Sequence, residues 1–437
     1  MKRLWINLIC LFLINVAMVR AEEFPGEKMS VTEIVAIVLK NNPAVREADA
    51  EIAAAAASVK SARADMLPEA EFSYGYTSLM DPTVMKMGGD EMQVSHQRMY
   101  NWDITVIQPL FTGFALNSKL NISKLDVAAK KLEKEQMLLD LTRNVKGACY
   151  NLLLTRRLLI VGEDEVSALE AHRHDAELFF KQGIIRRNDL LQAQVALANS
   201  RQMLENARSE VRKTEITLNR LMNRPLELSV ILDDKGLEPD SYGQSDTAFL
   251  EEKALESRPL LRLLDVGIEQ LGLTEKLAKS TWYPSLALVG QYERSGDDPM
   301  GTNNDYSNDY NASISAQLQW KFWVGGKTSA DMEHARMKLR ALKASVEKYR
   351  QLVLEEVRGT LLDCDVARGN IETAESALEQ AKENWRITEL QYREQTALAS
   401  DVLDARAFLS QADANYYRAF YGYMNAVAAL HRAVGEK

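Results

Sequence analysis

The chain has 437 residues, and its 53 lysines and arginines against 62 aspartates and glutamates give a net charge of −9. This acidic balance argues against nucleic-acid binding, which needs a basic face. Three cysteines without a Cys-x-x-Cys pair exclude a zinc ribbon or a disulfide-stapled scaffold, and the lack of a second long apolar run excludes a helical membrane protein, though not a membrane barrel.

Residues 1–21 have the pattern of a secretory signal peptide. Two basic residues precede an apolar run over residues 4–19, and Ala21 places a small residue at the cleavage site. The alternative is an uncleaved anchor helix, but Asn7 and Asn15 interrupt the run. We therefore favour cleavage after Ala21 and expect an exported protein.

The remaining chain repeats itself. Asn42-Pro43 recurs 216 residues later as Arg258-Pro259, and Asp189-Leu190-Leu191-Gln192-Ala193 recurs 212 residues later as Asp401-Val402-Leu403-Asp404-Ala405. Prolines and glycines cluster between the two copies. The sequence thus predicts a first structural repeat over 22–222, a linker over 223–247 and a second repeat over 248–437.

Each repeat contains long helical stretches with a heptad seam. No proline occurs between Pro109 and Pro225 or after Pro299, and helix-favouring residues dominate both stretches. Five apolar positions seven residues apart predict coiled-coil packing in each repeat; they are Leu190, Leu197, Leu204, Val211 and Leu218, and Val402, Leu409, Tyr416, Tyr423 and Leu430. Residues 113–182 alone would form a helix of roughly 100 Å at about 1.5 Å per residue.

Four segments between the helices alternate apolar and polar residues, as strands with one wet face do. They cover about 69–78, 100–111, 285–294 and 311–323. Their length suits a tilted strand that crosses a bilayer, and tryptophans near their ends suit contact with membrane lipid. The alternative is a soluble sandwich, but no further strands are predicted that could bury the apolar face.

Four strands cannot close a membrane barrel, and an open edge in hydrocarbon leaves backbone groups unsatisfied. Copies of the chain must therefore share one barrel, of eight strands in a dimer or twelve in a trimer. The face expected to line the lumen is polar; it carries Glu71, Ser73, Asp103, Thr105, Ser315 and Gln317.

This plan resembles the TolC-like outer membrane efflux protein family over essentially the whole mature chain. The resemblance rests on the duplicated helix–strand–strand–helix–helix order, on Gln108-Pro109-Leu110-Phe111-Thr112-Gly113 and on the segment 401–405. It implies a mainly α-helical protein with a membrane β-barrel: a homotrimeric channel-tunnel whose twelve-stranded barrel continues into a helical coiled-coil barrel. It also implies an outer-membrane location in a Gram-negative-type cell, with the helices in the periplasm.

The same resemblance implies a function without a cofactor or enzymatic chemistry. The protein would be the outer membrane channel of a tripartite efflux or type I secretion system, and would conduct substrates passively from an inner-membrane pump. A periplasmic adaptor (membrane fusion) protein and the pump would engage its closed periplasmic tip. A drug, metal-ion or protein pump could each use such a duct. The alternative is a periplasmic coiled-coil adaptor or scaffold without a pore, which should carry one hairpin instead of two.

Two aspartates at the tip are candidate aperture residues. Asp401 and Asp404 are three residues apart and lie on one helical face, so three copies would form two rings of carboxylates that favour cations. The local alternative is that an acidic residue at a helix start satisfies free backbone N–H groups. The family resemblance favours the rings, because both positions match its aperture aspartates.

Other tip residues acquire roles only through the resemblance. Tyr392 and Asp189 match residues whose hydrogen bonds hold neighbouring coils shut, and Gly183-Ile184-Ile185 resembles the loop that the adaptor grips. One departure is Ala397, where the family pattern has an arginine. Arg186, Arg187 or Arg393 would have to replace it, or the closed state is weaker.

Three further expectations complete the prediction. Cys149 and Cys364 lie inside helical patterns and are interpreted as small buried residues. His172 and His174 are two residues apart on a helix, so they point to different faces and make a poor metal pair. The segments 80–97 and 295–309 are predicted to be exposed turns.

Overall fold

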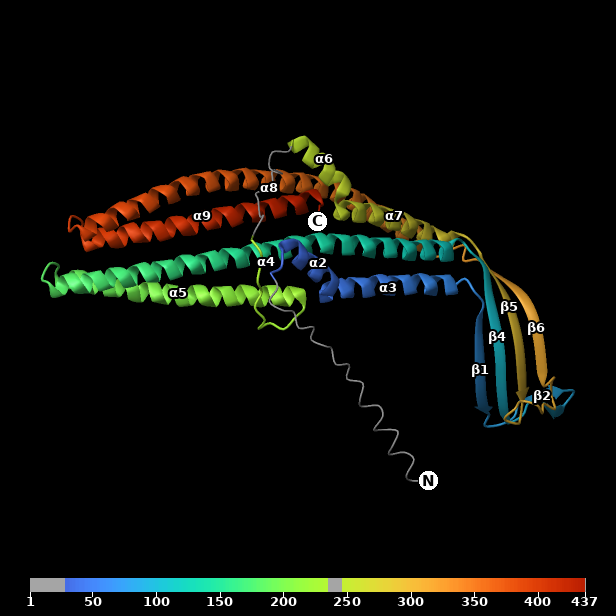
Figure 1. Cartoon of the computed structure of the whole chain (residues 1–437). Helices are drawn as coiled ribbons and strands as arrows, with labels where there is room; N and C mark the ends of the chain where they lie inside the picture. The colour runs from blue at the N-terminus through green and yellow to red at the C-terminus, as the bar shows by residue number, and fades with distance from the viewer. Residues whose placement is uncertain (1–27, 235–245, 437) are drawn as a thin grey trace, which may run out of the picture.

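The computed structural model describes residues 28–234 and 246–436; the predicted signal peptide and residues 235–245 of the predicted linker lie outside this described part. The helices form one long body, and a four-stranded sheet turns away from one end of it (Figure 1). In chain order the elements are α2 (Val31–Asn41), α3 (Pro43–Ala64), β1 (Glu69–Ser78), β2 (Val84–Met87), β3 (Asp90–Gln93), β4 (Arg98–Thr112), α4 (Ala115–Lys181), α5 (Arg187–Met222), α6 (Thr247–Ser257), α7 (Pro259–Lys279), η2 (Ser280–Trp282), β5 (Ser285–Gly296), β6 (Tyr310–Gln319), α8 (Lys327–Arg393) and α9 (Ala399–Val434).

The internal duplication is visible in the lengths of the helices. The long helices α4 and α8 each have 67 residues, and their partners α5 and α9 each have 36. The short helices α2 and α6 have 11 residues each. The two halves therefore share one order of two helices, two strands and two helices, and the β2–β3 hairpin is an addition to the first half.

The four long strands form one antiparallel sheet in the order β1-β4-β5-β6, so strands from both repeats meet at β4 and β5. Over the middle of the strands, rows of mainly apolar residues alternate with rows of mainly polar ones, as the predicted polar and apolar faces require, although Glu69 faces Ile107 and Trp102 faces Arg294. One row of the sheet contains Phe72, Ile104, Tyr292 and Ala312, and the next contains Glu71, Thr105, Gln291 and Ser313.

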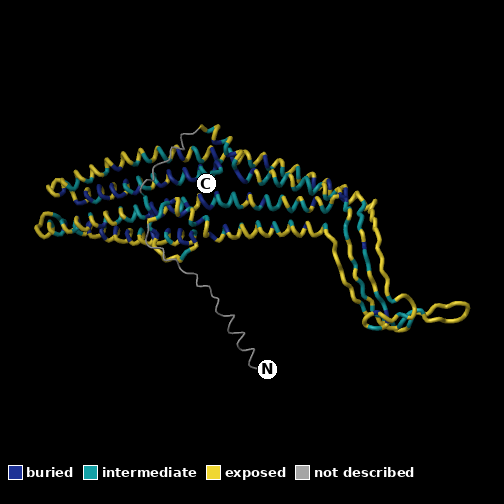
Figure 2. Tube along the Cα trace, turned by 45° about the vertical axis from the view of Figure 1, so that its right-hand side comes forward, coloured by how far each residue is buried: buried dark blue, intermediate teal, exposed yellow. Residues whose placement is uncertain are grey.

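Nothing in the described chain covers the outer strands of this sheet. Every residue of β6 is exposed, as are all residues of β1 except Gly75 (Figure 2). The Ile314 side chain is 81% exposed and that of Phe72 64% exposed. Each outer strand also pairs on one side only, so two backbone edges remain open.

The predicted end of the last strand is wrong. The sequence pattern extended it over 311–323, whereas β6 ends at Gln319. Gln319 pairs with Ser285, the first residue of β5, and Pro284 stands before that residue. A proline has no N–H to donate, so the ladder ends there and the residues after Gln319 have no partner strand.

The hydrophobic core lies in the middle of the helical body, where the two repeats and the short helices α2 and α6 meet. Leu152 of α4, Leu218 of α5, Val357 of α8 and Leu430 of α9 are fully buried there. Beside them the nearly buried Arg258 pairs with Glu356, and Glu356 also pairs with Arg432. Packing between α4, α7, α8 and α9 thus joins the repeats at mid-length.

Candidate functional site

The candidate site is formed by the two hairpin turns that lie together at the end of the helices far from the sheet (Figure 1). Residues 182–186 join α4 to α5, and residues 394–398 join α8 to α9. Equivalent backbone bonds close both turns. The Ile184 amide donates to the Phe179 carbonyl at 2.9 Å, and the Thr396 amide donates to the Gln391 carbonyl at 2.8 Å.

Both turns need one residue in the left-handed region of backbone space. In the first turn this residue is Gly183, with φ of +76°. In the second turn it is Gln395, with φ of +64°. A side chain with a Cβ is strained in this conformation, by about 1–2 kcal/mol. The second tip therefore has the same geometry as the first at a higher conformational cost.

The carboxylate at the third position of each following helix caps that helix. Asp189 accepts a hydrogen bond from the Arg186 amide at 3.0 Å, and Asp401 accepts one from the Leu398 amide at 3.0 Å. This is the local role that the sequence left open for Asp401. Asp404 lies one turn further on, is exposed, and forms no hydrogen bond or ion pair with the described residues.

Tyr392 lies inside the contact between the two hairpins. It is 4% exposed and packs with Ala399 and Val402 of α9 and with Phe179 of α4. Its hydroxyl has no hydrogen-bond partner in the described chain, so it is not bonded to Asp189. Burial, with the negative charges of Asp175 and Asp189 nearby, raises the pKa of Tyr392.

In the described chain, none of the three arginines considered as substitutes at Ala397 donates a hydrogen bond to the Tyr392 hydroxyl. Arg393 pairs with Glu389 of its own helix at 2.6 Å, and Arg186 and Arg187 are exposed on the first hairpin. Ala397 itself packs against the cluster around Tyr392.

The structure instead contains a buried arginine that the sequence analysis missed. Arg406 of α9 is 8% exposed, and its guanidinium lies 5.6 Å from the centre of the Trp385 ring. Burial lowers the pKa of Arg406, and the carboxylates of Glu165 and Asp164 on α4 oppose this effect. Its place between Val402 and Leu409, four and three residues away on the apolar seam, was the signal that could have found it.

The predicted adaptor-contact residues lie at the surface of the first turn. Gly183 is exposed, the Ile184 side chain is 43% exposed, and Ile185 is half-buried. An apolar side chain at the end of a turn, with space around it, is available for contact with another protein.

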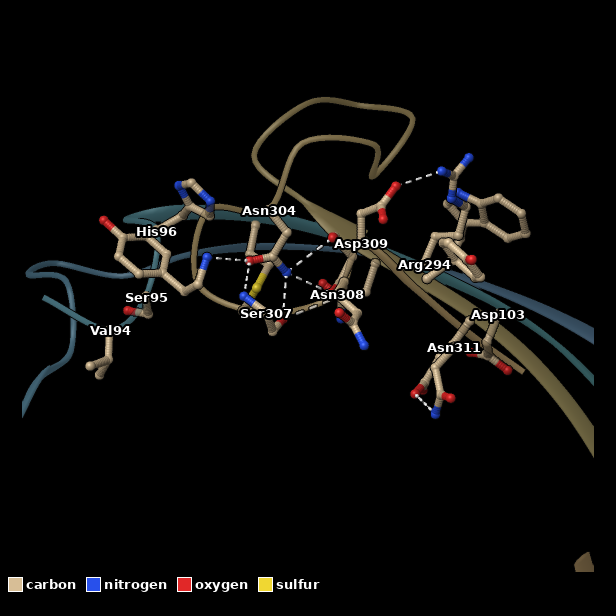
Figure 3. Close-up of a pocket in the computed structure, with 17 residues that line it drawn as sticks. Val94, Ser95, His96, Asp103, Arg294, Asn304, Ser307, Asn308, Asp309 and Asn311 are labelled. Atoms are coloured by element: carbon tan, nitrogen blue, oxygen red, sulfur yellow. Dashed lines mark hydrogen bonds and ion pairs between the residues drawn. The ribbon is translucent and has the colours of Figure 1, made fainter. Parts of the chain in front are cut away.

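A second hollow lies at the opposite end of the molecule, among the loops beyond the strands (Figure 3). It has a volume of about 650 Å³ and a mostly polar lining. Asn304 donates to Ser295 and Ser307, and Arg294 pairs with Asp309 at 2.7 Å.

The predicted turn 80–97 contains more regular structure than expected, because β2 and β3 pair within it.

Two features are absent from the described residues. None of the described helices combines the length and the apolar character that a membrane crossing needs. Within the same residues, no group of three histidines, cysteines or acidic side chains is arranged to hold a metal ion.

Comparisons with known proteins agree with the architecture. The family described as outer membrane efflux protein matches residues 35–224 and 250–436. Outer membrane protein TolC of Vibrio cholerae serotype O1 is 23% identical over 417 residues, covering 93% of this chain and 90% of that protein. Nodulation protein T of Rhizobium leguminosarum bv. trifolii is 22% identical over 414 residues, covering 93% and 85%.

Solved structures of channels have the same fold. The outer-membrane channel OprN aligns with a TM-score of 0.78 at 18% identity, over 93% of this chain and 90% of that one. The open-state MtrE outer membrane channel of Neisseria gonorrhoeae aligns with a TM-score of 0.75 at 16% identity, over 93% and 89%. The chain belongs to the outer membrane efflux protein family. It is an outer membrane channel component of efflux or secretion, and the adaptor alternative has no support among these relatives.

Proposed function

We propose that three copies of the chain form one passive duct, which carries substrates from an inner-membrane pump to the cell exterior. The observation that carries this proposal is the sheet with two open edges and an exposed apolar face. Edge-to-edge pairing of three sheets satisfies every open backbone edge and gives a twelve-stranded barrel. The polar rows that contain Glu71 and Asp103 would then line a water-filled lumen.

The trimer is tested by size and by conductance. Protein purified in detergent should have the mass of three chains and should dissociate only on heating in denaturing detergent. In planar bilayers it should form discrete ion-conducting channels. A monomer of stable mass that leaves the bilayer insulating would refute the proposal.

Closure of the duct is assigned to the helical tip. Asp401 and Asp404 of three copies would form two acidic rings around the axis, while Asp401 also caps α9. Tyr392 and Asp189 would act as the latch between neighbouring coils. The burial of Tyr392 between the hairpins and its unpartnered hydroxyl support this role, because a buried hydroxyl gains free energy from any partner it finds.

The partners are assigned to the outside of the same tip. A periplasmic adaptor protein would contact Gly183, Ile184 and Ile185, and the pump would feed the opened end. A pull-down of the adaptor with wild type and with Ile184→Asp tests this contact. Equal recovery of the adaptor with both proteins would exclude Ile184 from the interface.

A further inference from the structure

His172 is enclosed in the contact between the two repeats. It lies on α4, and its ring centre is 4.9 Å from that of Tyr392 on α8. His172 is 6% exposed and Tyr392 is 4% exposed. Neither Nε2 of His172 nor the hydroxyl of Tyr392 has a hydrogen-bond partner in the described chain. A polar group that is buried without a partner loses its hydrogen bonds to water and gains none in return.

The unpaired groups mark a region of weak attachment between the repeats. Nε of Arg406 and Oγ of Ser410, both on α9, are also buried without a partner in the tip half of the described helices. Away from the tip, Oε1 of Gln136 and Nε of Arg258 are also buried without a partner, but Arg258 is anchored at mid-length by its ion pair with Glu356 and by a 3.0 Å hydrogen bond to the Arg432 carbonyl. The hairpins are thus joined firmly at mid-length and loosely near the tip, which is where they can part at the lowest cost.

The surroundings of His172 favour its neutral form. Burial lowers the pKa of His172, and Asp175 on the same helix opposes this effect only in part. On the other helices, Tyr392 of α8 packs against His172 with an uncharged ring. The carboxylate of Asp189 on α5 helps to raise the pKa of that tyrosine. Arg406 of α9, a buried cation in the same half of the helices, is surrounded by the carboxylates of Glu165, Asp164, Asp413 and Glu389.

We propose that His172 is a gating residue of the tip: its neutral imidazole fits the closed contact with Tyr392, and its protonation drives the two hairpins apart. The inference rests on the proposed function, since it needs a duct that closes at this end. It adds a regulation that the aperture and latch residues do not supply, namely opening by acid.

The direction and size of the effect follow from linkage. Burial in the described contact lowers the pKa of His172; if this contact belongs to the closed duct, as proposed, closure is favoured above the ordinary histidine pKa of about 6.5 and is progressively lost as pH falls below it. The closed-to-open ratio then falls by up to about tenfold per pH unit for each copy. Three copies that open together would respond more steeply than one.

The experiment measures conductance against pH on the side of the bilayer that the tip faces. Wild type should be more open at pH 5.5 than at pH 7.5, by up to about tenfold for each copy that titrates. His172→Gln cannot titrate and should abolish this response. The matched control is His174→Gln, because His174 is exposed on the same helix and its variant should keep the wild-type response.

A second variant covers the case in which an amide disturbs the packing. His172→Phe retains a ring against Tyr392 and also cannot titrate, so it should remain closed at pH 5.5. The inference is overturned if either His172 variant assembles and still opens in acid as wild type does. It is also overturned if wild type conducts equally at both pH values. Neither result contradicts the proposed channel function. A wild type that forms no channel at all would overturn the proposed function and this inference with it.

Discussion

The Asp401 carboxylate and the Leu398 amide are joined by a 3.0 Å hydrogen bond that closes the first turn of α9. The same bond, between Asp189 and the Arg186 amide, closes the first turn of α5. Asp401 thus has a local structural role besides the one proposed in the aperture. A substitution at Asp401 must therefore remove its negative charge without removing its capping hydrogen bond, so that the two roles can be told apart.

Removing the charges of the proposed rings while keeping the helix cap should make the aperture less restrictive to ions. Asp401→Asn with Asp404→Asn keeps an oxygen acceptor at the helix start and removes six charges from a trimer. We expect higher single-channel conductance and weaker block by multivalent cations, measured in planar bilayers. Asp401→Ala alone should also lose about 1 kcal/mol of helix stability, which the asparagine variant should not. Unchanged cation block in the double variant would exclude the rings.

Removing the Tyr392 hydroxyl should make the closed duct leakier. Tyr392→Phe keeps the ring contacts with His172 and Phe179, so the core of the tip should survive. The hydroxyl has no partner within the described chain, so the bond at stake is one that it would gain from a neighbouring copy in the proposed trimer; losing that bond, worth about 0.5–1.5 kcal/mol, should raise the closed-state conductance by up to about tenfold. Tyr416→Phe, which alters a tyrosine packed beside Leu378, is the control. Wild-type conductance in Tyr392→Phe would remove this hydroxyl from the latch.

Relieving the strained turn should stabilise the tip. Gln395→Gly removes a side chain from a residue with φ of +64° and should gain about 1 kcal/mol. The reciprocal change, Gly183→Gln, should cost a similar amount, because an added Cβ at Gly183 meets no atom and only the backbone term remains. Thermal unfolding followed by circular dichroism compares the two. Shifts of the same sign would contradict the argument.

Breaking the buried charge cluster at mid-length should destabilise the helical body strongly. Arg258→Ala removes a buried guanidinium from its bonds to Glu356 and to the Arg432 carbonyl; Glu356 is 32% exposed and keeps Arg432 as a partner, so the expected cost is about 1–3 kcal/mol. Arg262→Ala is the control, since Arg262 and Glu135 are paired at 3.1 Å but exposed, and should cost no more than about 1 kcal/mol. Equal loss of stability in the two variants would show that the bonds of Arg258 contribute no more to stability than an exposed ion pair does.

The two cysteines in the described part of the chain should resist thiol reagents in the folded protein. Both Cys149 and Cys364 are free and buried, and burial raises their pKa to about 12 and about 11 respectively. At pH 8 both should stay thiols, and iodoacetamide should modify them only after denaturation, as read by mass spectrometry. Rapid labelling of Cys149 in the native protein would contradict its burial.

The long elements were predictable because their period is strong. The heptads through Leu197 and Leu409 specify the coiled coils, and the alternation around Ile314 specifies an amphipathic strand. The short helix α2 was missed although Ser30 and Glu33 form a capping box before it, because three buried residues make a weak periodic signal. The β2–β3 hairpin was missed for the same reason, since its strands are only four residues long.

For the candidate site, the sequence predicted where each residue lies on its own helix or turn, but not which residues of other helices it contacts. Its residues could be placed at a turn or on a helical face from their spacing, as for Asp401 and Asp404. What lies across the contact could not be predicted, because it depends on which helices of the two repeats become neighbours. His172 and Tyr392 are 220 positions apart in sequence, and only the packed structure brings their rings together.

The bare backbone edges of β1 and β6 have a consequence for the life of the protein before assembly. A newly exported copy presents two rows of unpaired N–H and C=O groups next to side chains as apolar as Ile314 and Phe72. Such edges join with any strand they meet, including those of misfolded neighbours. In the proposed trimer, association of the three copies would therefore have to accompany the folding of the sheet, because only a neighbouring copy supplies the strand that each edge lacks.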